Sequence, residues 1–188
     1  MRIRGSRLVV PRWAAVTLRV ALLLLGGVWT GWAVCRFGDL RIAYSPSVPL
    51  GIYRLEPGPV GRGDYVMFCP PPGPLFDDAL RHLWLAPGEC PAGTRALMKI
   101  VVAEQGDHVV FRDDGVFVDG QRVPHSDCRT KDFHGVTLPR PPVRDLVLGP
   151  DERVLMSLKG PQSFDARYFG AIKGHILGRL TPLFTWER

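Results

Sequence analysis

The chain has 188 residues, of which 46% are hydrophobic, and a formal net charge of +6. This length is enough for one ordinary domain with its own core. Six arginines and a single aspartate lie within residues 1–40, so this segment carries +5 and the other 148 residues carry only +1. A nucleic-acid-binding face on the folded part is therefore disfavoured, because it could neutralise few phosphates. We expect no direct nucleic-acid partner.

An apolar segment follows the first arginines. From Trp13 to Cys35 its only polar side chains are those of Thr17, Arg19 and Thr30. The uncharged part has 16 residues, whereas a membrane span needs about 20. Arg19 can extend its guanidinium toward the lipid headgroups, which lengthens the usable span. We therefore predict a transmembrane anchor at residues 13–36.

The arginine excess predicts the orientation of this anchor. Arginine and lysine are enriched on the cytoplasmic side of membrane helices, so we expect residues 1–12 to form a basic cytoplasmic tail and residues 37–188 to lie outside, with the lipid bilayer as a partner. A cleaved secretory signal is the competing interpretation. The long apolar stretch with Trp29 and Trp32, and a poor cleavage site at residues 33–35, favour an anchor.

The part beyond residue 37 is rich in short β-type runs. Two turn signals separate some of them, Asp113-Asp114-Gly115 and Asp119-Gly120, and both are typical of β-hairpins. Runs of alternating or continuous apolar residues predict strands at residues 64–68, 96–102, 108–112, 116–119, 153–158 and 176–185.

One stretch outside the predicted anchor has helical periodicity. Between Leu75 and Leu85 the apolar residues fall on one side, and two aspartates occupy the first turn; the apolar residues are Leu75, Ala79, Leu80, Leu83 and Trp84. The predicted fold class is therefore mainly β: an antiparallel β-sheet domain with a short helical insertion, preceded by one N-terminal transmembrane helix.

The cysteines allow one disulfide around this helical insertion. Cys69 and Cys90 flank it, and an outer compartment would be oxidising. A bridge between them would close a loop of about 20 residues and contribute ~3 kcal/mol in the chain-entropy model. Cys128 would then be unpaired. The run 125–128 (His-Ser-Asp-Cys) has no second pair of residues at ligand spacing, so we expect no metal and no cofactor.

A serine and a lysine are the candidate catalytic residues. Ser47 lies between two prolines after the apolar segment, and Lys99 lies inside the run Leu97–Val102. Serine needs a base, and the sequence contains no Gly-x-Ser-x-Gly elbow or recognisable histidine triad. Loss of hydration lowers the pKa of lysine from ~10.4 toward neutrality, so Lys99 could serve. A solvent-facing lysine on an edge strand and an ordinary loop serine remain the alternatives.

Three motifs together resemble the type I signal peptidases. The Ser-x-Ser-Val-Pro pattern at residues 45–49 is similar to their nucleophile box. Residues 99–107, which end in Gly-Asp, are similar to their lysine box, and residues 163–170 to their Asp-x-Arg box. The Pro-Leu-Gly-Ile-Tyr continuation at 49–53 resembles a subfamily, the TraF-type conjugative-transfer peptidases. The resemblance implies a signal-peptidase-like fold.

The resemblance also implies a role for each matched residue. Ser47 would be the nucleophile and Lys99 its base. Ser45 would donate its hydroxyl to an oxyanion hole beside the Ser47 backbone N–H. Ser163 would hydrogen-bond and orient the lysine. Two further residues, Asp165 and Arg167, would pair near the site and hold that loop; an exposed pair would add little stability, so positioning is the expected role.

Three functions follow from these observations. The first is a Ser/Lys peptidase of the bacterial inner membrane, with its catalytic domain in the periplasm, that processes or cyclises a pilin precursor for conjugative plasmid transfer. Mating-pair-formation proteins are then further candidate partners. The second is a general type I signal peptidase that cleaves exported preproteins. The third is a non-enzymatic scaffold of a secretion or conjugation channel.

Overall fold

The computed structural model describes residues 11–157 and 162–186. Most of the predicted basic tail, residues 1–12, lies outside these ranges, as does the last residue of the strand predicted at 153–158. The chain divides into two compact units, Met1–Leu40 and Arg41–Arg188.

The first unit contains helix α1 (Arg12–Phe37). Its segment Trp13–Val34 has 22 residues with a mean hydropathy of 1.6, none of them buried. The hydroxyl of Thr30 donates to the Gly26 carbonyl at 2.6 Å, and that of Thr17 to Ala14 at 3.0 Å. These polar side chains are therefore satisfied within the helix itself, as an apolar environment requires. The helix is long and apolar enough for a membrane span or a signal anchor.

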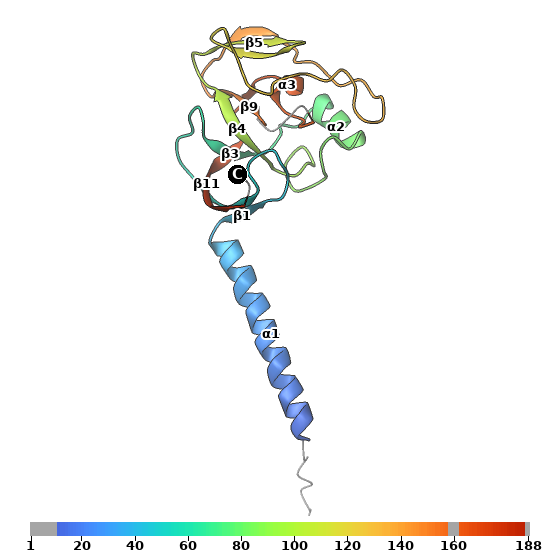
Figure 1. Cartoon of the computed structure of the whole chain (residues 1–188), viewed down its shortest axis with the longest axis vertical. Helices are drawn as coiled ribbons and strands as arrows, with labels where there is room; N and C mark the ends of the chain where they lie inside the picture. The colour runs from blue at the N-terminus through green and yellow to red at the C-terminus, as the bar shows by residue number, and fades with distance from the viewer. Residues whose placement is uncertain (1–10, 158–161, 187–188) are drawn as a thin grey trace, which may run out of the picture. The chain divides into compact units, whose positions relative to one another are not determined.

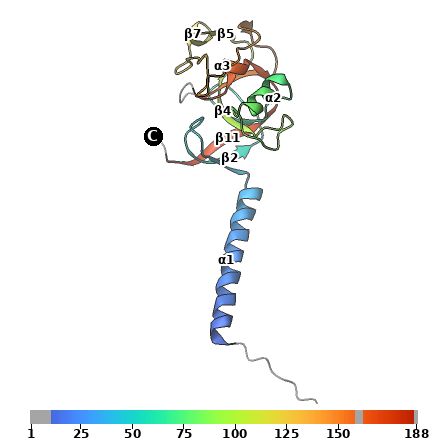
Figure 2. The same cartoon turned by 90° about the vertical axis from the view of Figure 1, so that its right-hand side faces the viewer.

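The second unit is built on a seven-stranded sheet. Its strand order is β1-β2-β11-β3-β4-β9-β10, and β2 and β11 lie side by side in Figure 2. The pairings from β2 to β10 are all antiparallel. The strands are β1 (Leu40–Ala43), β2 (Gly51–Glu56), β11 (Ile176–Thr185), β3 (Tyr65–Phe68), β4 (Leu97–Ala103), β9 (Glu152–Met156) and β10 (Ile172–Lys173).

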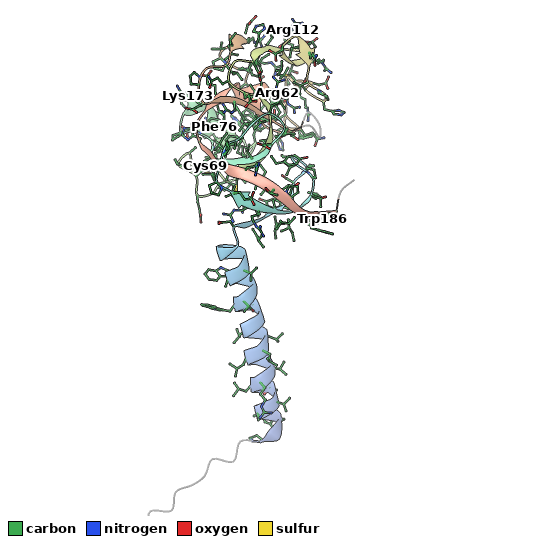
Figure 3. The ribbon with its side chains drawn as sticks, turned by 90° about the vertical axis from the view of Figure 1, so that its left-hand side faces the viewer. Arg62, Cys69, Phe76, Arg112, Lys173 and Trp186 are labelled. Carbon is green, nitrogen blue, oxygen red and sulfur yellow. A yellow bond between two sulfur atoms is a disulfide. The ribbon has the colours of Figure 1, made fainter. Side chains whose placement is uncertain are left out.

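A four-stranded antiparallel sheet with the order β7-β6-β5-β8 lies beyond β4 in Figure 1. Its strands are β5 (His108–Arg112), β6 (Gly115–Val118), β7 (Gln121–Arg122) and β8 (Asp145–Val147). Asp119 and Gly120 join β6 to β7 with φ values of 50° and 78°, which is the two-residue hairpin turn that an Asp-Gly pair favours. In Figure 3, Arg112 of β5 and Trp186 beyond β11 lie at opposite ends of this unit.

Two short helices complete the second unit. Helix α2 (Pro74–Arg81) buries Phe76 and Ala79, and helix α3 (Ala166–Phe169) is buried throughout. The helical insertion is shorter than the sequence predicts, since α2 ends at Arg81. Leu83 adopts a left-handed conformation with φ of 59° and is 81% exposed, so its expected place on the buried face is wrong.

The core has two parts. A large cluster centred on β4, β5, β6, β9 and α3 includes Val101, Val109, Leu155 and Tyr168. A smaller cluster is formed by Ala43, Val48, Tyr53 and Leu180. The predicted fold class is confirmed: a mainly antiparallel β domain with a short helical insertion follows one N-terminal apolar helix.

Candidate active site

Lys99 is buried on strand β4, with only 3% of its surface exposed. Side chains alternate along a strand, and Lys99, Val101 and Ala103 occupy the buried positions of β4. The solvent-facing alternative for Lys99 is therefore wrong. Burial lowers the pKa of its amine from 10.5 to about 8; the charge of Asp165 opposes this shift and that of Arg167 adds to it. Roughly a tenth of the amine is thus neutral one pH unit below this pKa.

The Lys99 amine lies within hydrogen-bond distance of two serines. Its Nζ is 3.0 Å from Ser47 Oγ and 2.6 Å from Ser163 Oγ. A neutral amine has a lone pair that can accept a proton from one hydroxyl while a second hydroxyl fixes the direction of the amine. The structure thus brings together the three residues that the sequence singled out for the nucleophile, its base and the orientation of that base.

The segment that carries Ser47 is anchored on both sides of the serine. It joins β1 to β2, and the next residue, Val48, is buried in the small core beside Tyr53. The Tyr53 hydroxyl donates to the Pro49 carbonyl at 2.7 Å. Gly51 must lack a side chain, because a Cβ there would lie 2.3 Å from the Phe184 carbonyl oxygen of β11. These contacts hold the Ser47 hydroxyl at the lysine.

Asp165 and Arg167 form a fully buried ion pair, with both side chains 0% exposed. Arg167 Nε donates to Asp165 Oδ1 at 2.8 Å and Nη2 donates to Oδ2 at 2.9 Å. The Ser157 backbone N–H also donates to Asp165, and its carbonyl accepts from Arg167. The expectation of pairing is met, but the pair is not exposed. It ties the end of β9 to the segment that holds Ser163.

The candidate nucleophile and base line a cleft of about 570 Å³. Ser45, Ser47, Lys99 and Ser163 all face it, and Ser45 is exposed to solvent. Ser45 lies two residues before Ser47, and both residues line the cleft. The arrangement can bind a peptide carbonyl beside a hydroxyl that has a base.

Several cleft residues escape prediction from the sequence. Ser157 contacts the ion pair through its backbone N–H and carbonyl, so its residue type does not indicate this role. The guanidinium of Arg95 donates to the Tyr44 hydroxyl at 2.8 Å, and both residues line the cleft. Trp84 also lines it, although its spacing in the sequence indicates a helix face.

The structure joins Cys69 and Cys90 by a disulfide, with 5.4 Å between their Cα atoms. The bridged loop carries α2 and Trp84, so the bridge restrains one wall of the cleft. Cys128 is a free thiol, and burial raises its pKa. Within residues 11–157 and 162–186, no group of three or more His, Cys, Asp or Glu side chains could hold a metal ion.

The chain belongs to the signal peptidase family, peptidase S26, which matches residues 12–185. The family predicted from the three motifs is thereby confirmed, and the protein is a member of a peptidase family with a signal-peptidase-like fold.

Two relatives resemble the chain over most of their length. It is 37% identical to a plasmid transfer protein TraF of Escherichia coli over 178 residues, which cover 94% of this chain and 97% of the relative. It is 34% identical to a conjugal transfer protein TraF of Agrobacterium tumefaciens over 176 residues, which cover 90% and 98%. A solved signal peptidase I from Enterococcus faecalis is 17% identical, covers 67% of this chain and 100% of its own, and has a TM-score of 0.36.

Proposed function

We propose that the chain is a membrane-anchored serine endopeptidase of conjugative transfer, in which Ser47 is the nucleophile and Lys99 the base. Its substrate is a membrane-borne pilin precursor. Three lines of support converge on this function: membership of a peptidase family, similarity to transfer proteins over 90% or more of the chain, and the geometry of the cleft. The observation that carries the proposal is the buried Lys99 amine, 3.0 Å from the Ser47 hydroxyl.

The first chemical step forms an acyl-enzyme. Ser47 Oγ attacks the scissile carbonyl carbon, and its proton passes to the neutral Lys99 Nζ. Ser45 Oγ and the Ser47 backbone N–H donate to the developing oxyanion; one such donor is worth about 2.7–4 kcal/mol of barrier. As the peptide C–N bond breaks, Lys99 returns the proton to the leaving amine.

The second step releases the product. Either water or an amino group of the precursor attacks the ester carbonyl, and Lys99 takes the proton of the attacking group. Ser47 then regains its hydroxyl proton. Attack by water gives a linear product, and attack by the amino terminus of the precursor gives a cyclic one. Ser163, at 2.6 Å from Lys99 Nζ, keeps the amine directed at the reacting atoms through both steps.

Attachment to a bilayer suits a membrane-borne substrate. An anchor formed by Trp13–Val34 would confine the enzyme and the precursor to the same surface, which raises their effective concentration. A weak intrinsic affinity for the peptide then suffices. The proposed location is the bacterial inner membrane, with the N-terminus in the cytoplasm and the β domain in the periplasm.

The test is cleavage of a co-reconstituted pilin precursor by the full-length chain in lipid vesicles. Ser47→Ala and Lys99→Ala should each reduce the rate by about 10²–10⁴-fold or more, the usual contribution of a positioned base. The exposed Lys173 on β10 provides a matched control, and Lys173→Ala should keep full activity. Retention of cleavage by either active-site variant would exclude the dyad.

The same assay separates the two peptidase functions. A preprotein with an ordinary secretory signal is supplied in parallel with the pilin precursor. Preferential cleavage of the pilin precursor supports the transfer function, whereas equal rates would indicate a general signal peptidase. The mass of the mature pilin identifies the acyl acceptor, since a cyclic product is lighter than the linear one by one water.

A further inference from the structure

A second pocket adjoins the catalytic cleft. It has a volume of about 180 Å³ and shares three lining residues with the cleft, Trp84, Gln162 and Phe164. Neither Ser47 nor Lys99 lines it. Pockets for whole small molecules have volumes of roughly 300–1,000 Å³, so this one suits a single side chain of a larger ligand whose main chain lies in the cleft.

The inner wall of this pocket is a stack of aromatic rings. The Trp84 and Phe164 rings are stacked with centroids 5.4 Å apart, and the Phe164 and Tyr168 rings with centroids 5.7 Å apart. Phe164 and Tyr168 are almost fully buried, so the wall is fixed by the core. It presents a flat apolar surface before any ligand arrives, which reduces the ordering cost of binding.

The outer wall belongs to the segment 129–138 and is held in place by polar contacts. The Trp84 indole N–H donates to Asp132 Oδ2 at 2.9 Å, which ties the two walls together. Asp132 Oδ1 accepts from the backbone N–H groups of His134 and Val136. The Arg129 guanidinium lies 4.3 Å from the centre of the Phe133 ring. The Asp132 carboxylate and the Arg129 guanidinium therefore both have partners among the residues of the pocket walls.

Two large apolar side chains of this pocket remain in solvent. Leu83 is 81% exposed and Phe133 is 72% exposed. Leu83 has φ of 59°, a left-handed conformation that is strained for a residue with a Cβ. Burial of its own side chain does not offset that strain. Exposed apolar groups and backbone strain at one pocket are both associated with binding sites.

We propose that this pocket, the aromatic pocket, is a substrate subsite that takes one large apolar side chain of the precursor, away from the cleaved bond. The inference rests on the proposed function. The occupant is identified by the lining residues that the pocket shares with the cleft, by the size of the pocket and by its apolar rim. The enzyme would then select precursors at two places: the cleft that holds the scissile bond, and the aromatic pocket beside it.

The experiment uses fluorogenic decapeptides with alanine at the cleaved bond. Each other position is changed in turn to alanine, serine, leucine or phenylalanine, and kcat/KM is measured with the full-length enzyme in detergent. At one position, leucine or phenylalanine should be preferred over alanine by about tenfold or more, as expected for methylenes placed in an apolar pocket. Leu83→Gly and Phe133→Ser should reduce this preference toward one.

Cleavage of the all-alanine peptide should be unchanged in both variants, because it leaves the pocket empty. Glycine tolerates the left-handed conformation at position 83, so Leu83→Gly should fold. Val147 on β8 is 64% exposed and outside the pocket, and Val147→Ser should keep the preference intact.

The outcomes separate the subsite from the proposed function. If the wild type cleaves the peptides in a Ser47-dependent manner without preferring a large apolar residue anywhere, the subsite is excluded and the function stands. Equal losses of activity toward all peptides in the variants would also exclude it. A preference that survives in both variants, with altered self-association in ultracentrifugation, would assign the pocket to a second copy of the chain instead. Absence of any Ser47-dependent cleavage overturns both proposals.

Discussion

The two sheets of the second unit differ in whether they contain buried charged groups. In and beside the seven-stranded sheet, Lys99, Asp165 and Arg167 are buried. In the four-stranded sheet, the charged groups lie at the surface: His108 and Asp145 pair at 2.7 Å with side chains that are 48% and 70% exposed. Both regions have a sheet of apolar strands and an aspartate at hydrogen-bond distance from a nitrogen-bearing side chain.

The difference lies in how much hydration each charged group loses on folding and what replaces it. An exposed pair exchanges water for a partner at little net gain. A buried charge loses its hydration and persists only with several hydrogen bonds around it. Asp165 and Arg167 have such bonds, whereas Lys99 responds through its lowered pKa. The chemistry of the cleft depends on that one amine, and the ion pair positions the segment that orients it.

Removal of one charge from the buried pair should have the largest effect, and it tests the difference between buried and exposed charges directly. Asp165→Asn should destabilise the chain by about 3–5 kcal/mol, because Arg167 would be left as an uncompensated buried charge. The measurement is thermal or denaturant unfolding of the full-length protein in one detergent. An Asp165→Asn protein that unfolds like the wild type would mean that the Arg167 charge reaches water, and would remove the contrast between the sheets.

The disulfide should give the next largest effect. The bridge between Cys69 and Cys90 spans 21 positions of sequence, and its removal in Cys69→Ser/Cys90→Ser should cost roughly 3 kcal/mol in the chain-entropy model. Cys128→Ser, which removes the free thiol, is the matched control and should have little effect. Reductant should lower the unfolding temperature of the wild type and leave the double variant unchanged.

The motifs in the sequence allow the site to be predicted better than the fold around it. The family boxes mark Ser47, Lys99 and Ser163, and in the structure both serines lie within hydrogen-bond distance of the Lys99 amine. The burial of Lys99 does not follow from its apolar neighbours alone, since the run Leu97–Val102 is apolar on both faces. Only the pairing of β4 between β3 and β9 fixes which alternate positions are covered.

Several elements were missed for identifiable reasons. Strands β1 and β2 flank the Ser47 segment, but prolines and glycine between them indicate a loop, and β2 is held by its pairing with β11, far along the chain. The predicted helix to Leu85 ends early because Leu83 adopts a left-handed conformation. Of the apolar residues in that stripe, Ala79 lies in the core as expected, whereas Leu83 and Trp84 line the aromatic pocket. The pairing of β2 with β11 is a long-range contact that the local sequence pattern does not reveal.

Replacing the buried amine by an apolar isostere should stabilise the protein. The folded-state pKa of Lys99 is about 8, below the ordinary value of 10.5. Between these values the unfolded chain binds more protons, so wild-type stability rises with pH, and the penalty is fully present below about pH 8. Lys99→Met should therefore gain about 2–3 kcal/mol at neutral pH while activity is lost.

The gain of Lys99→Met should shrink as the pH rises above about 8, because the wild-type amine is then neutral in the folded state. Unfolding temperatures of both proteins between about pH 6 and 9 measure this difference. A gain that does not depend on pH would indicate improved packing rather than relief of a buried charge.

The activity of the wild type should report the same group. Since the neutral amine is the base, kcat/KM should rise about tenfold per pH unit below about pH 8 and level off above it. Peptide hydrolysis across this range is the measurement, with conditions matched for ionic strength. A profile governed by a group near pH 6.5 would instead point to histidine, and a rise only near pH 10 would mean that the lysine is hydrated.

The smallest effect is expected in the four-stranded sheet, and it completes the contrast. Asp145→Asn removes the acceptor of the His108 contact, but both side chains are about half exposed or more, so water replaces the lost partner. The change in stability should be within about 0.5 kcal/mol, and kcat/KM should be unchanged. The same chemical substitution, aspartate to asparagine, would then differ several-fold in cost between the two sheets. The difference would reflect the burial of Asp165 together with its arginine partner and its backbone donors. Burial is also the physical property that lowers the pKa of Lys99.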